Sequence, residues 1–366
     1  MRIALVTGLH GLARYEAVQA LLSATPRSLA VHHDLAHIGQ GTVYRLVRDA
    51  SGARDREQVH IEHACASCTL REDLIPFLLG VATAGRHDLA VVEAWNSVEP
   101  RLIAESIAAQ EELHLAAVVT GVDTARLTAD LGTHDDLADR GLDLGRDDPR
   151  TVAEVLTRQL EYPGLITLRG EPTPHAHALL TQLNPEAPVV PASAAAEGRL
   201  DAGFDTEAAY ARLNPAWAHY TDRPEDHGVS TVVWTRTRPL HPGRLAEALE
   251  DLSSLSLRGR GRFWLASQPD NLMVWDSHQD LLMVDNGGPW LDALPEAAMD
   301  LVAPARRAAA LRDWDPEVGD RRQHLAFTGV GMDARALVEL LDSCLVTEDE
   351  AGQGFANDPF PAFSDR

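Results

Sequence analysis

The stretch Ile3-Ala-Leu-Val-Thr-Gly8 decides how the first half of the chain folds. Its apolar run is closed by a turn glycine, and apolar residues then recur at helical spacing over residues 15–23. This order predicts a strand, a turn and a helix. Further apolar runs lie at residues 29–32, 89–93, 115–120, 164–168 and 188–191, with helical patterns at 72–83, 99–110 and 150–160. The alternation predicts an α/β fold with a doubly wound, mainly parallel sheet.

The second half of the chain follows a different pattern. Strands are predicted at residues 229–236, 262–266, 272–275, 280–284 and 325–329, and helices at 243–254, 304–312 and 335–344. Trp234, Trp264 and Trp275 are expected in the core of this smaller α+β domain. We therefore expect a first domain over residues 1–195, a linker with one short helix over 196–228, the second domain over 229–350 and a tail over 351–366.

Composition narrows the class of protein. A chain of 366 residues exceeds the usual size of one core, so two domains are expected. The formal charge of −23 argues against nucleic acid as a partner, since such binding starts from a basic surface. No run approaches the length of a membrane span, so we expect no membrane partner and a cytoplasmic location. All 32 basic residues are arginine, and Cys65, Cys68 and Cys344 are too few for a disulfide framework.

The turn after the first strand lies where a phosphate-binding P-loop would be. The pattern G-x-x-x-x-G-K-[ST] falls on residues 8–15, where only Gly8 matches. Ala13 replaces the second glycine, Arg14 replaces the lysine, and Tyr15 replaces the hydroxyl residue that would hold Mg²⁺. These changes favour an ordinary strand-to-helix turn over a tight nucleotide site, with Gly8, Gly11 and Arg14 as the remaining candidate contacts.

A second segment, residues 59–68, concentrates side chains that bind metals. It holds two thiols in a C-x-x-C pair, and Zn²⁺ prefers four sulfur, nitrogen or oxygen ligands. Cys65, Cys68 and His63 are the first-choice ligands, and alternation on a strand would place Ile61, His63 and Cys65 on one face. A reduced buried pair and a thioredoxin-like site are the alternatives. The fourth ligand would come from a substrate group, from water, or from one of His32, His33, Asp34 and His37.

Together these segments resemble the CobW family of P-loop GTPases, to which GTP-dependent zinc chaperones belong. Residues 238–245, 258–266, 319–329 and 331–345 resemble the C-terminal domain of that family in order and spacing. Residues 65–73 resemble its metal motif C-x-C-C-T-L-R-x-D, with Ser67 in the place of the middle thiol. The resemblance therefore implies a P-loop NTPase-like first domain and a zinc site that keeps two of three thiolates.

Two further stretches resemble nucleotide motifs of the family in altered form. Residues 93–100 resemble E-[ST]-T-G-x-x-E-P, and residues 168–171 fall on the guanine-selecting N-K-x-D. The resemblance thus implies Glu93, Arg169 and Glu171 as nucleotide contacts, but the degraded motifs leave GTP and Mg²⁺ doubtful. We expect a zinc-binding metallochaperone-like pseudo-GTPase that transfers or senses Zn²⁺ and contacts a client protein. The alternatives are a slow GTP-hydrolysing zinc chaperone and a metal-free interaction scaffold.

Overall fold

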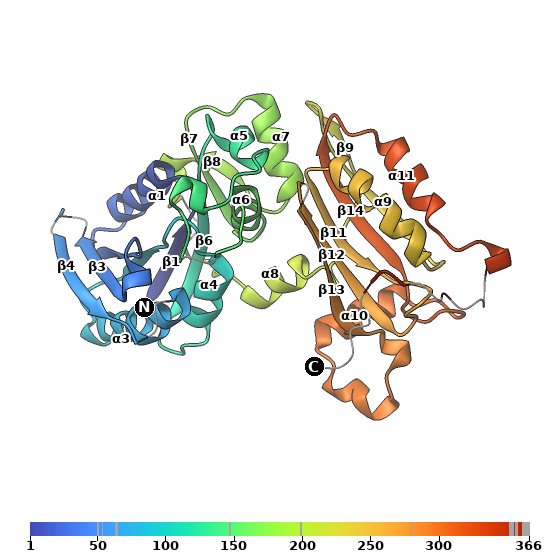
Figure 1. The fold of residues 1–366 in the computed structure, drawn as a ribbon. Helices are drawn as coiled ribbons and strands as arrows, with labels where there is room; N and C mark the ends of the chain where they lie inside the picture. The colour runs from blue at the N-terminus through green and yellow to red at the C-terminus, as the bar shows by residue number, and fades with distance from the viewer. Residues whose placement is uncertain are drawn as a thin grey trace. The chain divides into compact units, whose positions relative to one another are not determined.

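The computed structural model describes residues 1–49, 51–52, 54–62, 65–145, 148–197, 200–279, 281–350, 355 and 358–360. The chain forms two compact units, Met1–Ala209 and Tyr210–Arg366, so the division falls inside the segment 196–228. Each unit contains its own β-sheet (Figure 1). Among the described residues, no helix is both long and apolar enough to cross a membrane.

The first unit is built on an eight-stranded sheet with the order β4-β3-β2-β5-β1-β6-β7-β8. The neighbouring strands β2, β5, β1, β6, β7 and β8 pair in parallel in this order. By contrast, β3 pairs antiparallel with both β2 and β4. This confirms the predicted doubly wound, mainly parallel sheet and adds an antiparallel extension that the sequence analysis did not predict. The strands are β1 (Arg2–Thr7), β2 (Ser28–Asp34), β3 (Thr42–Asp49), β4 (Arg54–His60), β5 (Leu89–Glu93), β6 (His114–Asp123), β7 (Leu165–Arg169) and β8 (Val189–Pro191).

Helices cover both faces of this sheet (Figure 1). On one face α1 packs Ala17, Val18 and Leu21 against inward residues of β1 and β5 in one apolar cluster. On the other face α4 buries Ile103 and Ile107. The helices of this unit are α1 (Gly11–Ala24), α2 (Ala66–Thr69), α3 (Ile75–Ala84), α4 (Pro100–Ala108), α5 (Leu127–Leu131), α6 (Val152–Glu161) and α7 (Pro174–Leu183), with the π-turn η2 (Leu70–Leu74) and the 3₁₀ turns η1 (Ile38–Gln40), η3 (Ala138–Arg140) and η4 (Ala192–Ala194). The helix α8 (Thr206–Leu213) spans the division between the units.

One local prediction is wrong. β4 ends at His60, so Ile61 does not belong to a strand, and Cys65 is the N-cap of α2. A thiol that accepts a backbone hydrogen bond at a helix start satisfies one of the unpaired amides there, which favours the cap over a strand. His63 lies outside the described residues, so its expected face is not tested.

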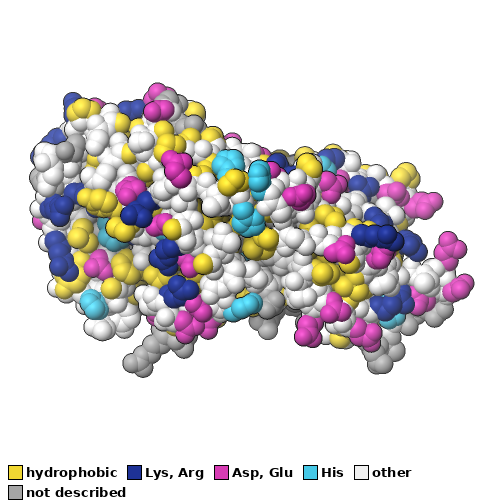
Figure 2. All heavy atoms as spheres, turned by 90° about the horizontal axis from the view of Figure 1, so that it is seen from above, with side chains coloured by type: hydrophobic (Ala, Val, Ile, Leu, Met, Phe, Trp, Pro, Cys, Tyr) yellow, Lys and Arg dark blue, Asp and Glu magenta, His cyan; other side chains and the backbone are white. Residues whose placement is uncertain are grey.

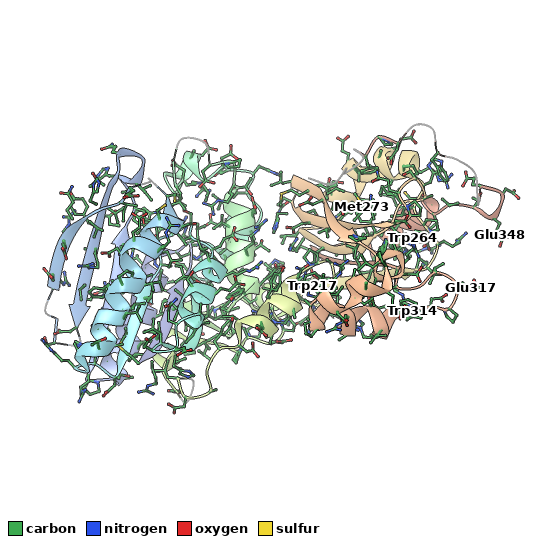
Figure 3. The ribbon with its side chains drawn as sticks, turned by 90° about the horizontal axis from the view of Figure 1, so that it is seen from below. Trp217, Trp264, Met273, Trp314, Glu317 and Glu348 are labelled. Atoms are coloured by element: carbon green, nitrogen blue, oxygen red, sulfur yellow. The ribbon has the colours of Figure 1, made fainter. Side chains whose placement is uncertain are left out.

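The second unit is an antiparallel sheet with the order β13-β12-β11-β14-β10-β9. One apolar cluster joins its inward residues to α9 and α11, and includes Trp234, Trp275 and Phe327. Trp264, labelled in Figure 3 with Met273 of β12, is also buried, so the three predicted core tryptophans are confirmed. The elements are β9 (Arg223–Asp226), β10 (Val229–Arg236), β11 (Arg258–Phe263), β12 (Asn271–His278), β13 (Leu281–Pro289), β14 (Gln323–Val330), α9 (Pro242–Ser254), α10 (Pro304–Asp313) and α11 (Ala334–Ser343), with the 3₁₀ turns η5 (Leu291–Ala293), η6 (Glu296–Leu301) and η7 (Glu348–Glu350).

Candidate functional site

The connection between β1 and α1 is short. Only Gly8, Leu9 and His10 separate the strand from the helix, which begins at Gly11. The amide of Arg14 already donates to the carbonyl of His10 at 3.0 Å. Residues 11–15, which would wrap a phosphate in a P-loop, therefore form the first turn of the helix.

Two glycines allow α1 to lie this close to the sheet. Gly8 has φ +135°, and a Cβ on it would lie 2.4 Å from the carbonyl oxygen of Gly121. A Cβ on Gly121 in β6 would lie 2.7 Å from the backbone of both Ala13 and Arg14. The glycines thus fix the close packing of backbone on backbone at the start of the helix.

The side chain of Arg14 is buried and turned back over the short loop. Its Nη1 donates to the carbonyl of Gly8 at 2.6 Å, and its Nη2 donates to Oδ1 of Asn96 at 2.6 Å. Its Nε donates to Oε1 of Glu93 at 3.4 Å. Burial lowers the pKa of Arg14, and the charge of Glu93 opposes that shift. The guanidinium donors are therefore used within the protein.

Glu93, at the end of β5, lies between two arginines. Its Oε2 accepts from Nη2 of Arg48 at 2.8 Å, while Oε1 faces Arg14. The Arg48 guanidinium also lies over the Tyr15 ring, with its Cζ 4.9 Å from the centroid. The structure thus brings together three predicted nucleotide contacts, Gly8, Arg14 and Glu93, and pairs them with one another.

Of the remaining predicted nucleotide contacts, Gly11 is the first residue of α1, and Arg169 and Glu171 lie at the end of β7. Arg169 donates from Nη1 to Asp123 and from Nε to Glu16, both at 3.0 Å. Glu171 is exposed in the connection that follows. Arg169 therefore ties β7 to β6 and to α1, and Glu171 is open to solvent.

His10 holds the loop in place, a role that the sequence analysis missed. Its Nδ1 accepts from the amide of Asp123 at 2.9 Å, so its Nε2 carries the proton and donates to Oδ2 of Asp130 at 3.1 Å. Burial lowers the pKa of His10, and Asp130 opposes the shift. No spacing rule links these residues, because Asp130 lies 120 positions from His10.

The two predicted thiol ligands share one turn. Cys65 caps α2, and its Sγ accepts from the amide of Cys68 at 3.2 Å. Cys65 is half-buried and Cys68 is buried, and both are free cysteines. The hydrogen bond with Cys65, together with burial, raises the pKa of Cys68 to about 11. In the absence of metal, the thiol of Cys68 therefore keeps its proton at neutral pH.

The other predicted ligands contribute less to this turn. His63 lies outside the described residues, and His37 is exposed just before η1. His32 uses Nδ1 to contact the carbonyl of Glu93 at 2.9 Å and stacks on Trp95. Within the described part of the chain, no three His, Cys, Asp or Glu side chains lie close enough to hold a metal ion.

A polar network supports the metal motif at its far end. Asp73 accepts from His33 at 2.7 Å and from Arg45, which also pairs with Glu57 of β4. Burial alone would raise the pKa of Asp73, but the hydrogen bonds and charges of His33 and Arg45 outweigh it, so the pKa is lowered. His33 is therefore engaged with Asp73 and fixes η2 to β2.

The chain is similar to a family model, to known proteins and to a solved structure. Residues 229–345 match the family model described as the cobalamin synthesis protein cobW C-terminal domain. The chain is 30% identical over 354 residues to a zinc chaperone of Mycobacterium tuberculosis strain H37Rv, covering 92% of this chain and 86% of that protein. It is 26% identical over 337 residues to the zinc-regulated GTPase metalloprotein activator 1 of Dictyostelium discoideum, covering 84% and 70%. A solved structure, the Zn(II)-bound YjiA GTPase from E. coli, aligns over 94% of this chain and 99% of that chain with a TM-score of 0.36 and 15% identity.

Proposed function

The chain belongs to the CobW family, and from that premise we propose that it is a zinc metallochaperone that binds Zn²⁺ at Cys65 and Cys68 and passes it to a client protein. The observation that carries the proposal is the pair of thiols on one turn, with Sγ of Cys65 3.2 Å from the amide of Cys68. The names of the relatives, a zinc chaperone and a zinc-regulated GTPase metalloprotein activator, support zinc as the cargo.

The ligand set suits a metal that must leave again. Two thiolates can share one Zn²⁺, and His63 is proposed as the third ligand. A position left open to water or to a ligand from the client allows exchange, as open positions do in other zinc sites. Because the raised pKa of Cys68 keeps that thiol protonated at neutral pH, binding must release its proton, and affinity should rise with pH.

We further infer that the protein works without hydrolysing GTP. A phosphate entering the turn after β1 would have to displace Arg14 from the carbonyl of Gly8 and from Asn96. The ring of Tyr15 stands at the position of the hydroxyl that would hold Mg²⁺ in a P-loop. Both features support a pseudo-GTPase, and no residue is assigned a catalytic role.

Zinc binding is tested on metal-free protein by competition with a chromophoric chelator. The Cys65→Ala/Cys68→Ala variant should bind Zn²⁺ about a hundredfold more weakly, or not at all, because it lacks both sulfur ligands. Cys344→Ala is the matched control, since this cysteine is buried in the second unit and should not affect affinity. Equal affinity of the double variant and the wild type would exclude the proposed site.

The nucleotide claim is tested separately by calorimetry with GTP and Mg²⁺. We expect no saturable binding at about 1 mM GTP, which corresponds to roughly −4 kcal/mol or weaker. Saturable binding at lower concentration, with slow release of phosphate, would instead establish the slow GTPase. That outcome would overturn the pseudo-GTPase inference and leave the zinc site intact.

A further inference from the structure

One face of the antiparallel extension is left open by the topology. α1 packs over the central strands. Its Tyr15 ring contacts the guanidinium of Arg48, near the end of β3. The opposite face of the extension is covered, because Arg45 contacts Asp73 of η2 and lies over the Phe77 ring of α3, with its Cζ 4.6 Å from the centroid. The open face is therefore the α1 side of β2, β3 and β4.

This open face contains a cavity of about 380 Å³. A volume of this size falls within the range of pockets that bind small molecules. Residues directly opposite each other on paired strands point to the same face, and Arg48 pairs with Arg54 while Leu46 pairs with Arg56. The side chains that line the cavity include Tyr15, His32, Leu46, Arg48, Arg54 and Arg56.

The cavity has more positive charge than its own carboxylates balance. Glu93, the buried acid of the lining, is already shared by Arg14 and Arg48. Asp55 also belongs to the lining, but alternation along β4 directs its side chain to the face of Glu57. Arg54 and Arg56 are exposed, and neither forms an ion pair with a residue that the structure describes, although the guanidinium of Arg56 lies over the Tyr44 ring with its Cζ 4.1 Å from the centroid. No carboxylate of the described residues thus neutralises either guanidinium, and both keep N–H groups that could donate to an anionic ligand.

A buried donor in the lining points to the same chemistry. Nε of Arg48 is buried and has no acceptor among the described residues. An unsatisfied buried donor is destabilising, so an acceptor that reached this Nε would be stabilising. Planar guanidinium groups bind carboxylate and phosphate oxygens through two parallel hydrogen bonds.

We propose that the cavity between the first turn of α1 and strands β2 to β4 binds a small oxyanion through Arg48, Arg54 and Arg56. The ligand is a carboxylate or phosphate group on a compact molecule that fits about 380 Å³. The site adjoins the turn after β1 through Tyr15 and Glu93, but Gly8, Gly11 and Arg14 do not line it. The proposed zinc thiols, Cys65 and Cys68, do not belong to its lining, so the oxyanion proposal does not depend on them.

The test is calorimetric titration of the full chain, at low salt, with inorganic phosphate in one series and citrate in the other. Arg54→Gln/Arg56→Gln should weaken binding by about tenfold or more, because it removes two charged donors. Arg101→Gln/Arg335→Gln is the matched control, since it removes two exposed arginines that pair with carboxylates four residues away on helices. It should bind both anions as the wild type does, and the tighter of the two anions identifies the ligand group.

A second variant separates a cavity from general attraction of anions. Leu46→Trp fills the space without changing the charge, and it should also weaken binding by about tenfold. The proposal is overturned if neither anion binds the wild type, or if the two double variants lose affinity equally. Wild-type affinity in a folded Leu46→Trp protein would overturn it as well, because the arginines would then act from the surface.

Discussion

At the scale of single residues, Arg14 shows where sequence reasoning ends. Its position in the degraded P-loop predicts a contact to phosphate, and the structure instead directs it to Glu93 and Asn96. Those partners lie 79 and 82 positions away, and no local pattern links them. The motif around Glu93 identifies it as a site residue, but its second partner, Arg48, escapes prediction because nothing in the sequence singles out one arginine of β3.

Removing Arg14 should destabilise the first unit. Arg14→Ala leaves the buried Glu93 with Arg48 as its one remaining ion-pair partner among the described residues, and breaking a buried ion pair costs about 3 kcal/mol. Urea unfolding of the variant and the wild type measures the difference. Arg335→Ala, an exposed residue of α11, should change stability by less than about 0.5 kcal/mol. A similar small change for Arg14→Ala would show that the pair contributes little.

His324 should make the second unit sensitive to acid. Burial lowers the pKa of His324 to about 3, and the positive charges of Arg262, His219 and Arg312 act in the same direction, while Asp313 opposes them. Its Nε2 accepts from the amide of Tyr220 at 3.0 Å, so protonation there would break a buried hydrogen bond.

The direction of the pH effect follows from the two states. An unfolded histidine takes up its proton near pH 6.5, whereas the folded one stays neutral down to about pH 3. The unfolded state therefore binds more protons between these values, and stability falls as pH drops below about 6.5. His324→Gln should flatten the decrease in Tm between about pH 7 and pH 5. His114→Gln, at an exposed position, is the control and should keep the wild-type slope.

At the scale of elements, the sequence predicts apolar strands well and polar strands poorly. β1, β5 and β6 are continuous apolar runs, because both faces of a central parallel strand are covered. β4 reads RDREQVH, with mostly exposed side chains, and has no such run. It is a strand because β3 pairs with it, which no local propensity shows.

The contact between α1 and β6 gives a prediction at this scale. Gly121→Ala would place a methyl group 2.7 Å from the backbone of Ala13, so the helix must shift, and we expect a loss of about 1–3 kcal/mol. Gly80→Ala in α3 is the matched control, since no described atom outside the adjoining turns of its own helix lies within 4 Å of the place that its methyl group would take. That change should be neutral or stabilise by up to about 1 kcal/mol. Chemical denaturation measures the free energy of unfolding of both variants. Equal values for Gly121→Ala and Gly80→Ala would contradict the close approach of α1 to β6.

At the scale of the whole molecule, composition predicts two domains, and each unit has its own sheet and apolar cluster. On the face drawn in Figure 2, acidic side chains of the described residues are interspersed with arginines. The net charge of −23 thus does not prevent a locally basic cavity, which the total charge could not reveal. The C-x-x-C spacing is enough to predict that the two thiols lie close together, whereas that cavity depends on strand pairing.

The two proposals for metal and nucleotide combine into one prediction for the whole chain. If the turn after β1 is closed by Arg14, GTP with Mg²⁺ cannot change the affinity for Zn²⁺. Zinc titrations with and without about 1 mM GTP should therefore give the same dissociation constant, a coupling factor of about one. A shift of about fivefold or more would mean that nucleotide and metal sites communicate, as in a working GTPase chaperone.

β4 forms a free edge of the eight-stranded sheet, since β3 is its one partner in the strand order. An unpaired edge invites strands of other molecules to add to it and start aggregation. Arg54, Asp55, Arg56 and Glu57 place charges of alternating sign along this edge, on both faces. A strand from another molecule that paired with β4 would have to remove these charged groups from water. The charged residues that hide β4 from sequence-based prediction therefore also protect the protein from edge-to-edge association.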